Sequence, residues 1–277
     1  MRVRWFTVDN DYLPFYASAT LLIILLVTPL VALIYTGLTD PINLALIFTN
    51  GQFIQSLTLT FTGAVAAAAL ALILGAPVAY ALARSMVPGW IGKVTSALLS
   101  SPMTIPHTVV GLAILIMASP LSPIPLARQL PLMNSMLGLV LAYFIVSSPI
   151  AIGSLTQVFE RINPVYEEVG LAIGMSRVGV FTRLILPMTI SEAVESYLLT
   201  WARAISEFGS IALVAYYVVA PPLFNYVYPM PVLVWYYYET YGLEPALGYA
   251  TATLLVSLMA LIIMETVRHY LNRYHYG

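Results

Sequence analysis

The sequence predicts an all-α integral membrane protein, built as a single domain over residues 1–277 with six transmembrane helices. Apolar residues occupy 60% of the 277 positions and charged residues only 8%, whereas a soluble domain carries about 25% charged residues. The absence of cysteine excludes disulfides and thiolate–metal sites, and a formal net charge of −1 gives no sign of a nucleic-acid partner. No G-x-x-x-x-G-K-[ST] phosphate loop occurs, so the chain has no ATP site of that type.

Six apolar stretches are long enough to cross the hydrocarbon core of a bilayer, which is about 30 Å thick and needs about 20 helical residues. They cover residues 13–38, 53–83, 94–118, 133–158, 184–218 and 245–264. The first is too long for the core of a signal peptide, so we expect it to remain as a span. Residues 219–244 are rich in proline and aromatic residues, which is typical of a loop at the outer membrane interface.

Two prolines interrupt the third apolar stretch. Pro102 and Pro106 each lack a backbone donor, so they predict a break in this helix. Broken helices are tolerated beside a cavity or a protein partner rather than beside lipid. His107 follows the break, where it would either satisfy backbone carbonyls freed by the prolines or serve as a proton relay or anion contact.

The distribution of basic residues predicts the orientation of the chain. Six spans place both termini on one side of the membrane, and nine of the eleven Lys and Arg residues fall on that side. These nine are Arg2, Arg4, Arg84, Lys93, Arg161, Arg177, Arg183, Arg268 and Arg273. Because basic loops stay in the cytoplasm, we expect a multi-pass protein of the cytoplasmic membrane with both termini inside the cell.

The longest charged stretch, residues 163–187, predicts an elbow of two helices on the cytoplasmic side. Asn163 can cap a helix, Pro164 suits the first helical position, and Gly174 suits a left-handed exit, which predicts a helix over residues 164–173.

A second helix should follow directly, because Ser176 can cap a helix that starts near Arg177. This helix should continue through Leu186 and Pro187 into the fifth span. The first helix has apolar residues at helical spacing, so one face can dock into a groove while Glu167 and Glu168 meet basic groups on a partner. Movement of that partner would then move the elbow and the fifth span.

The spacing within this loop resembles the signature of permeases from ATP-binding-cassette (ABC) importers. Glu168 is followed six residues later by Gly174 and, thirteen residues further on, by Pro187 directly after Leu186. Val169 and Gly170 stand where the family usually has an alanine pair. The loop would therefore be the element through which the ATP-hydrolysing subunits act.

Three further segments resemble the molybdate/tungstate branch of these permeases, which has sulfate-transporting relatives. They are residues 77–89, 101–115 and 201–217. The resemblance implies a homodimer, two separate cytoplasmic subunits that bind ATP and Mg, and an external binding protein that delivers a tetrahedral oxyanion. The chain itself would hold no cofactor and would not be an enzyme, and tungstate or molybdate would be the transported ion, with sulfate as the alternative.

Two intramembrane charges, Arg203 and Glu207, lie four residues apart and so on one helix face. They would either line the translocation path, with Arg203 attracting the oxyanion, or form a structural ion pair that fixes helix packing. Hydroxyl groups could similarly bind the oxyanion or hydrogen-bond between helices; these belong to Ser100, Ser101, Thr104, Ser206 and Ser210.

Two other classes of protein compete with this interpretation. A stand-alone carrier would use Glu207 and His107 for proton coupling, since intramembrane acids often serve that role in pumps. An intramembrane hydrolase would need a nucleophile–base pair or a metal cluster, and a chain with three histidines and no cysteine offers little for either.

Overall fold

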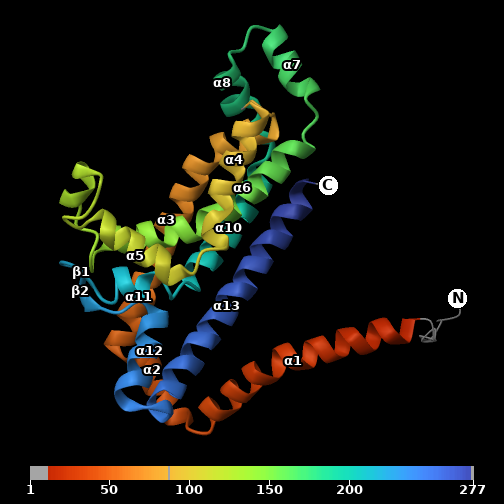
Figure 1. Cartoon of the computed structure of the whole chain (residues 1–277). Helices are drawn as coiled ribbons and strands as arrows, with labels where there is room; N and C mark the ends of the chain where they lie inside the picture. The colour runs from red at the N-terminus through yellow and green to blue at the C-terminus, as the bar shows by residue number, and fades with distance from the viewer. Residues whose placement is uncertain (1–11, 87, 276–277) are drawn as a thin grey trace, which may run out of the picture.

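The computed structural model describes residues 12–275 except residue 87, and helices dominate this part of the chain (Figure 1). Arg2 and Arg4, which contribute to the predicted cytoplasmic charge, lie outside the described residues. The longer helices are α1 Leu13–Leu38, α2 Pro41–Thr49, α3 Gly51–Ala83, α4 Gly89–Ser100, α5 His107–Met117, α6 Met136–Arg161, α7 Val165–Ala172, α10 Ile190–Ile205, α12 Met230–Tyr241 and α13 Leu243–His275. The shorter elements are the 3-10 helices η2 Ser101–Met103 and η3 Pro125–Gln129, the α-helical turns α8 Arg177–Val180, α9 Leu186–Met188 and α11 Ile211–Val214, the π-helix η4 Phe181–Ile185, and the antiparallel strands β1 Val218–Ala220 and β2 Phe224–Val227.

Four of the described helices, α1, α3, α6 and α13, are long and apolar enough to cross a membrane, and α4 with α5 makes a fifth if the pair counts as one span. These helices fall on five of the six predicted stretches. The remaining stretch, 184–218, does not form one continuous helix, because α10 ends at Ile205 after 16 residues and α11 begins only at Ile211. The predicted count of six spans is therefore not reached by length and composition among the described helices.

The predicted break in the third stretch is confirmed. The chain bends by 105° between α4 and α5. Pro106 adopts an extended conformation, with φ −54° and ψ 131°, directly before α5 begins at His107. Because Pro106 has no N–H to donate, α4 cannot continue through it. After the bend, α5 begins with His107 packed against Gly209.

Small residues let α3 and α6 pack closely along their lengths, and α10 packs against both. A Cβ atom on Gly63 would lie 3.0 Å from Leu139, and one on Gly75 would lie 3.0 Å from Ile152. Buried alanines of α3 extend the same face. Close approach of backbones through small residues is the usual way that helices associate in a membrane, so these three helices form the core of the fold.

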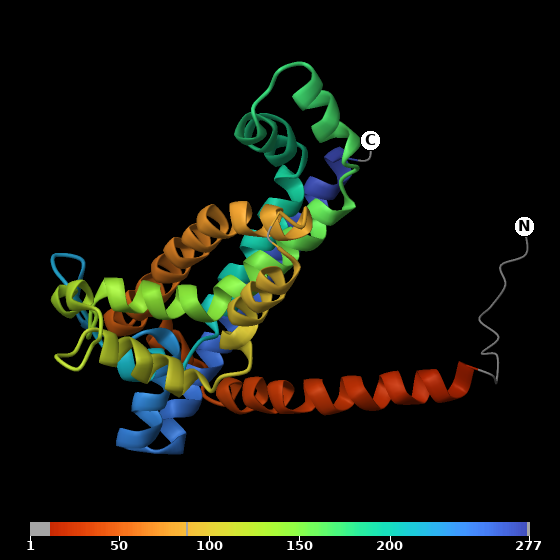
Figure 2. The ribbon, with the colours of Figure 1, turned by 45° about the horizontal axis from the view of Figure 1, so that its top comes forward.

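The first helix stands apart from this core. None of the 26 residues of α1 is buried, and both views show the helix projecting away from the bundle (Figures 1 and 2). Only its C-terminal end is attached, where Thr251 Oγ1 of α13 donates a hydrogen bond to Leu33 O over 3.2 Å. The apolar surface of α1 is therefore available to lipid or to another chain.

The segment 219–244, expected as an interfacial loop, is ordered into the β1–β2 hairpin and α12. Several of its tyrosines pack on one another; the rings of Tyr228 and Tyr236 stack at 4.7 Å, and those of Tyr237 and Tyr249 stack at 3.9 Å. These ring contacts involve residues of α12, which lies toward the end of the bundle opposite to α7 and α8 (Figure 1).

Candidate functional site

The elbow predicted over residues 163–187 is present, and its capping follows the sequence. Asn163 Oδ1 accepts a hydrogen bond from Val165 N at 3.0 Å, and Ser176 Oγ accepts one from Gly179 N at 3.1 Å. Gly174 has φ +89°, the left-handed conformation that only glycine adopts without strain. The first helix, α7, covers residues 165–172 rather than 164–173, and α8 begins at the predicted residue, Arg177.

One face of α7 is uncovered in this chain. Val165 is 53% exposed, Val169 55% and Ile173, just beyond the helix, 74%. Glu168 is also exposed and forms no ion pair within the described part of the chain. The apolar docking face predicted from the sequence therefore lies at the surface, with one carboxylate beside it.

The neighbouring carboxylate behaves differently from the prediction. Glu167 was expected to meet basic groups on a partner, but its Oε1 lies 2.6 Å from Nε of Arg84 at the end of α3. Both side chains are largely buried, with exposed fractions of 12% for Arg84 and 14% for Glu167. Glu167 therefore binds within the chain, and Glu168 is the acidic residue of α7 that faces outward.

The connection from the elbow to α10 is irregular. After α8 the chain forms the π-helix η4, in which Leu186 N donates to Phe181 O, five residues back. Pro187 follows and has no N–H to donate, and Thr189 departs from helical geometry with φ −112° and ψ 19°. The helix expected to continue through Leu186 and Pro187 is instead wound loosely in η4 and interrupted at Thr189 before α10 begins.

The second predicted group of residues meets around Glu207, whose side chain is completely buried. Its Oε2 lies 3.2 Å from Nη2 of Arg203 and 2.8 Å from Nδ1 of His107. Its Oε1 accepts hydrogen bonds from the backbone N–H and the hydroxyl of Ser210, each over 2.9 Å. Arg203 and Glu207 thus form an ion pair, and the carboxylate is fully satisfied by four contacts.

His107 joins this cluster rather than bonding to carbonyls freed by the prolines. Its two ring nitrogens lie 3.1 and 3.3 Å from Nη2 of Arg203. Tight backbone packing holds it there, since a Cβ atom on Gly209 would lie 2.9 Å from Cβ of His107. The contact joins residues about a hundred positions apart, which no local pattern in the sequence indicates.

The side chains of the cluster differ in their exposure to solvent. The side chain of Arg203 is 25% exposed and that of His107 33%, whereas Glu207 is 0% exposed. Arg203 also donates to the hydroxyl of Ser206 over 3.3 Å. The donors therefore form the accessible side of the cluster, with the carboxylate behind them. Pro102 and Pro106 lie at the bend between α4 and α5 that precedes His107. The side chain of Ser100, another predicted hydroxyl donor, lies outside the described atoms.

The elbow and this cluster, called here the Arg203 cluster, lie at opposite ends of α10. The helix begins at Ile190 beside the elbow and ends at Ile205, between Arg203 and Glu207. Its 16 residues span about 24 Å at 1.5 Å per residue. A displacement at one site can reach the other along this helix.

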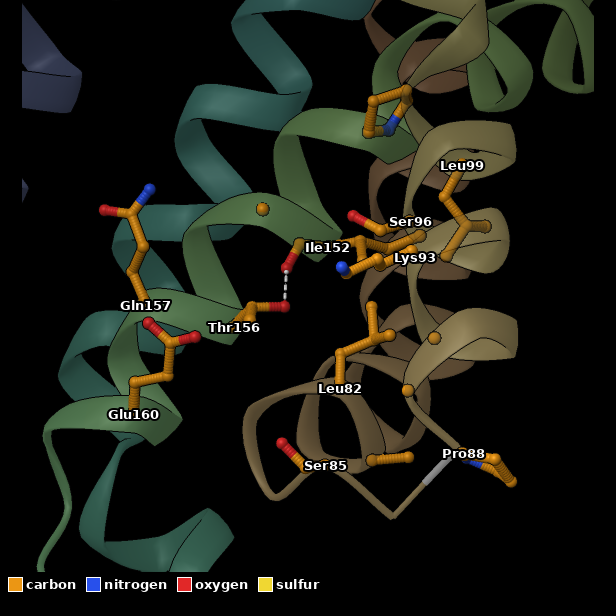
Figure 3. A pocket seen from close by; sticks show the side chains of 15 residues that line it. Leu82, Ser85, Pro88, Lys93, Ser96, Leu99, Ile152, Thr156, Gln157 and Glu160 are labelled. Atoms are coloured by element: carbon orange, nitrogen blue, oxygen red, sulfur yellow. Dashed lines mark hydrogen bonds between the residues drawn. The ribbon is translucent and has the colours of Figure 1, made fainter.

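A polar cavity of about 600 Å³ lies between the end of α3, α4 and α6 (Figure 3). Lys93 and Ser96 of α4 face Ile152 and Thr156 of α6 across it, and Glu160 lies at the α6 end. Sequence reasoning missed this cavity, because its walls come from three segments of the chain and no motif marks them. In the described residues, no group of three or more His, Cys, Asp or Glu side chains is placed to hold a metal ion.

Comparison with known proteins shows which proteins the chain resembles in sequence. The family model described as "Binding-protein-dependent transport system inner membrane component" matches residues 75–273. The chain is 30% identical over 251 residues to the molybdate/tungstate transport system permease protein WtpB of Thermococcus kodakarensis, covering 91% of this chain and 93% of that protein. It is 28% identical over 272 residues to the sulfate transport system permease protein CysT of Synechocystis sp., covering 95% and 91%.

Among solved structures, the chain resembles a bacterial alginate ABC transporter crystallised in complex with an alginate pentasaccharide-bound periplasmic protein. The TM-score is 0.65 at 19% sequence identity, and the match covers 97% of each chain. At that identity the similarity shows the fold.

Proposed function

The chain belongs to the family of inner membrane components of binding-protein-dependent transport systems, and from this we propose that it is the permease subunit of an ATP-driven importer for tungstate or molybdate. As a permease of the ABC importer family it is a multi-pass membrane protein that is not itself catalytic, because the ATPase of such an importer is a separate subunit. The observation that carries the choice of substrate is the similarity to WtpB over 91% of the chain.

Sulfate is the competing substrate, because CysT is similar over an equally large share of the chain. Tungstate, molybdate and sulfate share a double negative charge and a tetrahedral arrangement of oxygens. The donors of the Arg203 cluster suit any of the three, so selection between them would rest with the binding protein that delivers the ion.

Within the cluster we assign Arg203 the role of transient anion contact. Its guanidinium and the imidazole of His107 are partly exposed and carry the hydrogen-bond donors. Glu207 neutralises Arg203 from behind, so an arriving dianion meets donors in a site that has little net positive charge. Weak binding of this kind suits a transport path, because an ion held too tightly would not leave.

Coupling to ATP hydrolysis would use the exposed face of α7. Val165 and Val169 supply apolar contact, and Glu168 supplies a charge for a basic groove on an ATP-binding subunit. Gly174 gives the sharp turn between α7 and α8, and Leu186 and Pro187 connect the elbow to α10. Two such subunits, carrying ATP and Mg, would act on a pair of permease chains.

A second copy of the chain completes the proposal. The 26-residue α1 has no buried residue, and α11 leaves Leu213 40% exposed near the Arg203 cluster. Two copies with α11 at the interface would enclose a path with one Arg203 cluster on each side. The distribution of basic residues favours a cytoplasmic position for both termini, and the binding protein would then dock at the opposite end, beside α12 and the hairpin.

The test is reconstitution of the complex in vesicles with its ATP-binding subunits and its binding protein. ATP hydrolysis and anion uptake are measured with the binding protein loaded with tungstate, molybdate or sulfate. We expect tungstate or molybdate to stimulate both, and no uptake when the ATP-binding subunits are omitted. Stimulation by sulfate alone would assign the chain to the sulfate branch, and uptake by the isolated chain would support a proton-coupled carrier.

A further inference from the structure

We propose that Arg84 is a positioning residue that clamps the elbow to α3, so that movement of the elbow is passed to α3 and α6 as well as to α10. The proposal rests on the coupling function assigned to the elbow. It differs from the expectation that the fifth apolar stretch alone transmits the movement.

The clamp is formed by one guanidinium with two separate acceptors. Nε of Arg84 lies 2.6 Å from Glu167 Oε1 in α7, and Nη2 donates to Ile162 O over 2.9 Å, directly after α6. Arg84 itself is the residue that follows the last turn of α3. One side chain therefore ties together the end of α3, the end of α6 and the first turn of α7.

The clamp is protected from water. Its two charged side chains are 12% and 14% exposed, so the ion pair is screened less than a surface pair. A planar guanidinium can serve both acceptors at once, whereas a lysine ammonium at this position could not keep the same fork. The ion pair and the hydrogen bond therefore hold the ends of α3, α6 and α7 in a fixed relative position.

An aromatic cluster lies directly beneath the ion pair and joins the same elements. The ring of Tyr80 in α3 lies 4.8 Å from that of Phe181 in η4 and 5.7 Å from that of Phe159 in α6. Phe159 and Phe181 are 6.0 Å apart, and the Arg84 guanidinium lies 6.0 Å from the centre of the Tyr80 ring. Aromatic contacts at these distances stabilise a fixed arrangement, so the base of the elbow is packed onto α3 and α6.

The route through α3 is more regular than the direct route. Between α8 and α10 the chain contains a π-helix, Pro187 and the non-helical Thr189. By contrast, α3 remains one α-helix of 33 residues even though Pro77 lies within it. Toward its other end, Thr60 Oγ1 accepts a hydrogen bond from Met230 N at 2.7 Å, which links α3 to α12. A rigid displacement of the elbow would therefore reach the opposite end of the bundle through α3.

The polar cavity provides space for a displacement of α3 and α6 relative to α4. It separates the clamped ends of α3 and α6 from α4, with Leu82 and Ser85 on the α3 side and Lys93 on the α4 side (Figure 3). Because this space is not filled by side chains, α3 and α6 can shift relative to α4 without overlap. The distance across the cavity should then change when the elbow moves.

Charge-neutral variants of the two clamp residues test the proposal in the reconstituted complex. Arg84→Gln and Glu167→Gln should retain assembly and ATP hydrolysis but lower the number of anions imported per ATP by about two- to thirty-fold, the range that such couplings usually span. The exchanged pair Arg84→Glu/Glu167→Arg should recover part of that loss, because it restores the ion pair but not the bond to Ile162 O. Glu265→Gln, which removes an exposed carboxylate 3.5 Å from Arg268, is the matched control and should behave as wild type.

A distance measurement keeps the test decisive if a variant is poorly active. The chain has no cysteine, so spin labels can be confined to Ser96→Cys and Thr156→Cys, and the distance between them within one copy reports the width of the cavity. ATP binding should change this distance in the wild-type background and change it less in Arg84→Gln. Wild-type import per ATP in both single variants, or an equal nucleotide-dependent change in distance with and without Arg84, would overturn the clamp. Failure of the wild-type complex to import any of the three anions would instead overturn the proposed function.

Discussion

Removing one member of the Arg203–Glu207 pair should damage the protein more than replacing both. The Glu207 carboxylate is fully buried and has four contacts, two of them from the neighbouring groups Arg203 and His107. Deleting one partner of a buried ion pair costs about 3–5 kcal/mol, whereas an apolar pair of similar volume is often neutral for stability. Since the Arg203 side chain is 25% exposed, its own loss of a partner is partly compensated by water.

The two single variants should therefore differ. Arg203→Met leaves the buried carboxylate with His107 and Ser210 as its remaining partners, and we place its cost near the middle of that range, about 4 kcal/mol. Glu207→Gln leaves an arginine that water can reach and keeps an acceptor for Ser210, so about 1–2 kcal/mol is expected.

Thermal unfolding of the purified chain in detergent measures these costs. The double variant Arg203→Met/Glu207→Met should unfold at a higher temperature than Arg203→Met alone. If the losses of Arg203→Met and of Glu207→Met, each made alone, simply add in the double variant, the pair is not a unit and the reasoning fails. If the double variant is stable and imports anions normally, the pair is structural and Arg203 does not contact the transported ion.

Three further predictions concern the elbow, the dimer and the packing of α5. Glu168→Lys should abolish import with the membrane domain still folded, because the charge reversal repels a basic groove, and Gly174→Leu should do the same by straining the turn at φ +89°; normal import with either variant would refute the coupling role. In the variant Ala212→Cys, a cross-link should join two copies of the chain in at least one of two states, with ATP or without it. An active complex that contains one permease chain would contradict this prediction. Gly111→Val should lower the unfolding temperature, since even its Cβ would lie 2.7 Å from Ser210 O; an unchanged unfolding temperature would show that this contact is not tight.

The local features of the elbow could be predicted from the sequence because each depends on a few neighbouring residues. Asn163 and Ser176 cap helices, and Gly174 takes the left-handed conformation, as their residue types indicate. The role of Glu167 could not be predicted in this way. Its partner Arg84 lies 83 positions earlier, and a carboxylate on a short amphipathic helix has the same local pattern whether it faces inward or outward.

The interrupted 184–218 stretch has a similar explanation. Its residues are apolar enough to be read as one span, but Glu207 turns back to accept hydrogen bonds from Ser210, which starts a new helical turn after a gap. Hydropathy averages over such a gap, because Arg203, Glu207 and Gly209 are outnumbered by their apolar neighbours. The break becomes intelligible only with His107 in place, since the approach of α5 requires the compact turn at Gly209.

The two helix breaks at the Arg203 cluster have a common consequence for the mechanism. Both helices that meet at the Arg203 cluster are broken there, α4–α5 at Pro106 and α10–α11 at Ser206–Ser210. Backbone groups freed at such breaks must be satisfied within the protein, and the Glu207 carboxylate does this for the N–H of Ser210. A junction held by hydrogen bonds and one ion pair can rearrange at lower cost than two continuous helices packed along their length. Movement of the elbow, transmitted through α10 or through the clamp and α3, would therefore act on the part of the bundle that rearranges most easily. The anion is proposed to pass at this same place.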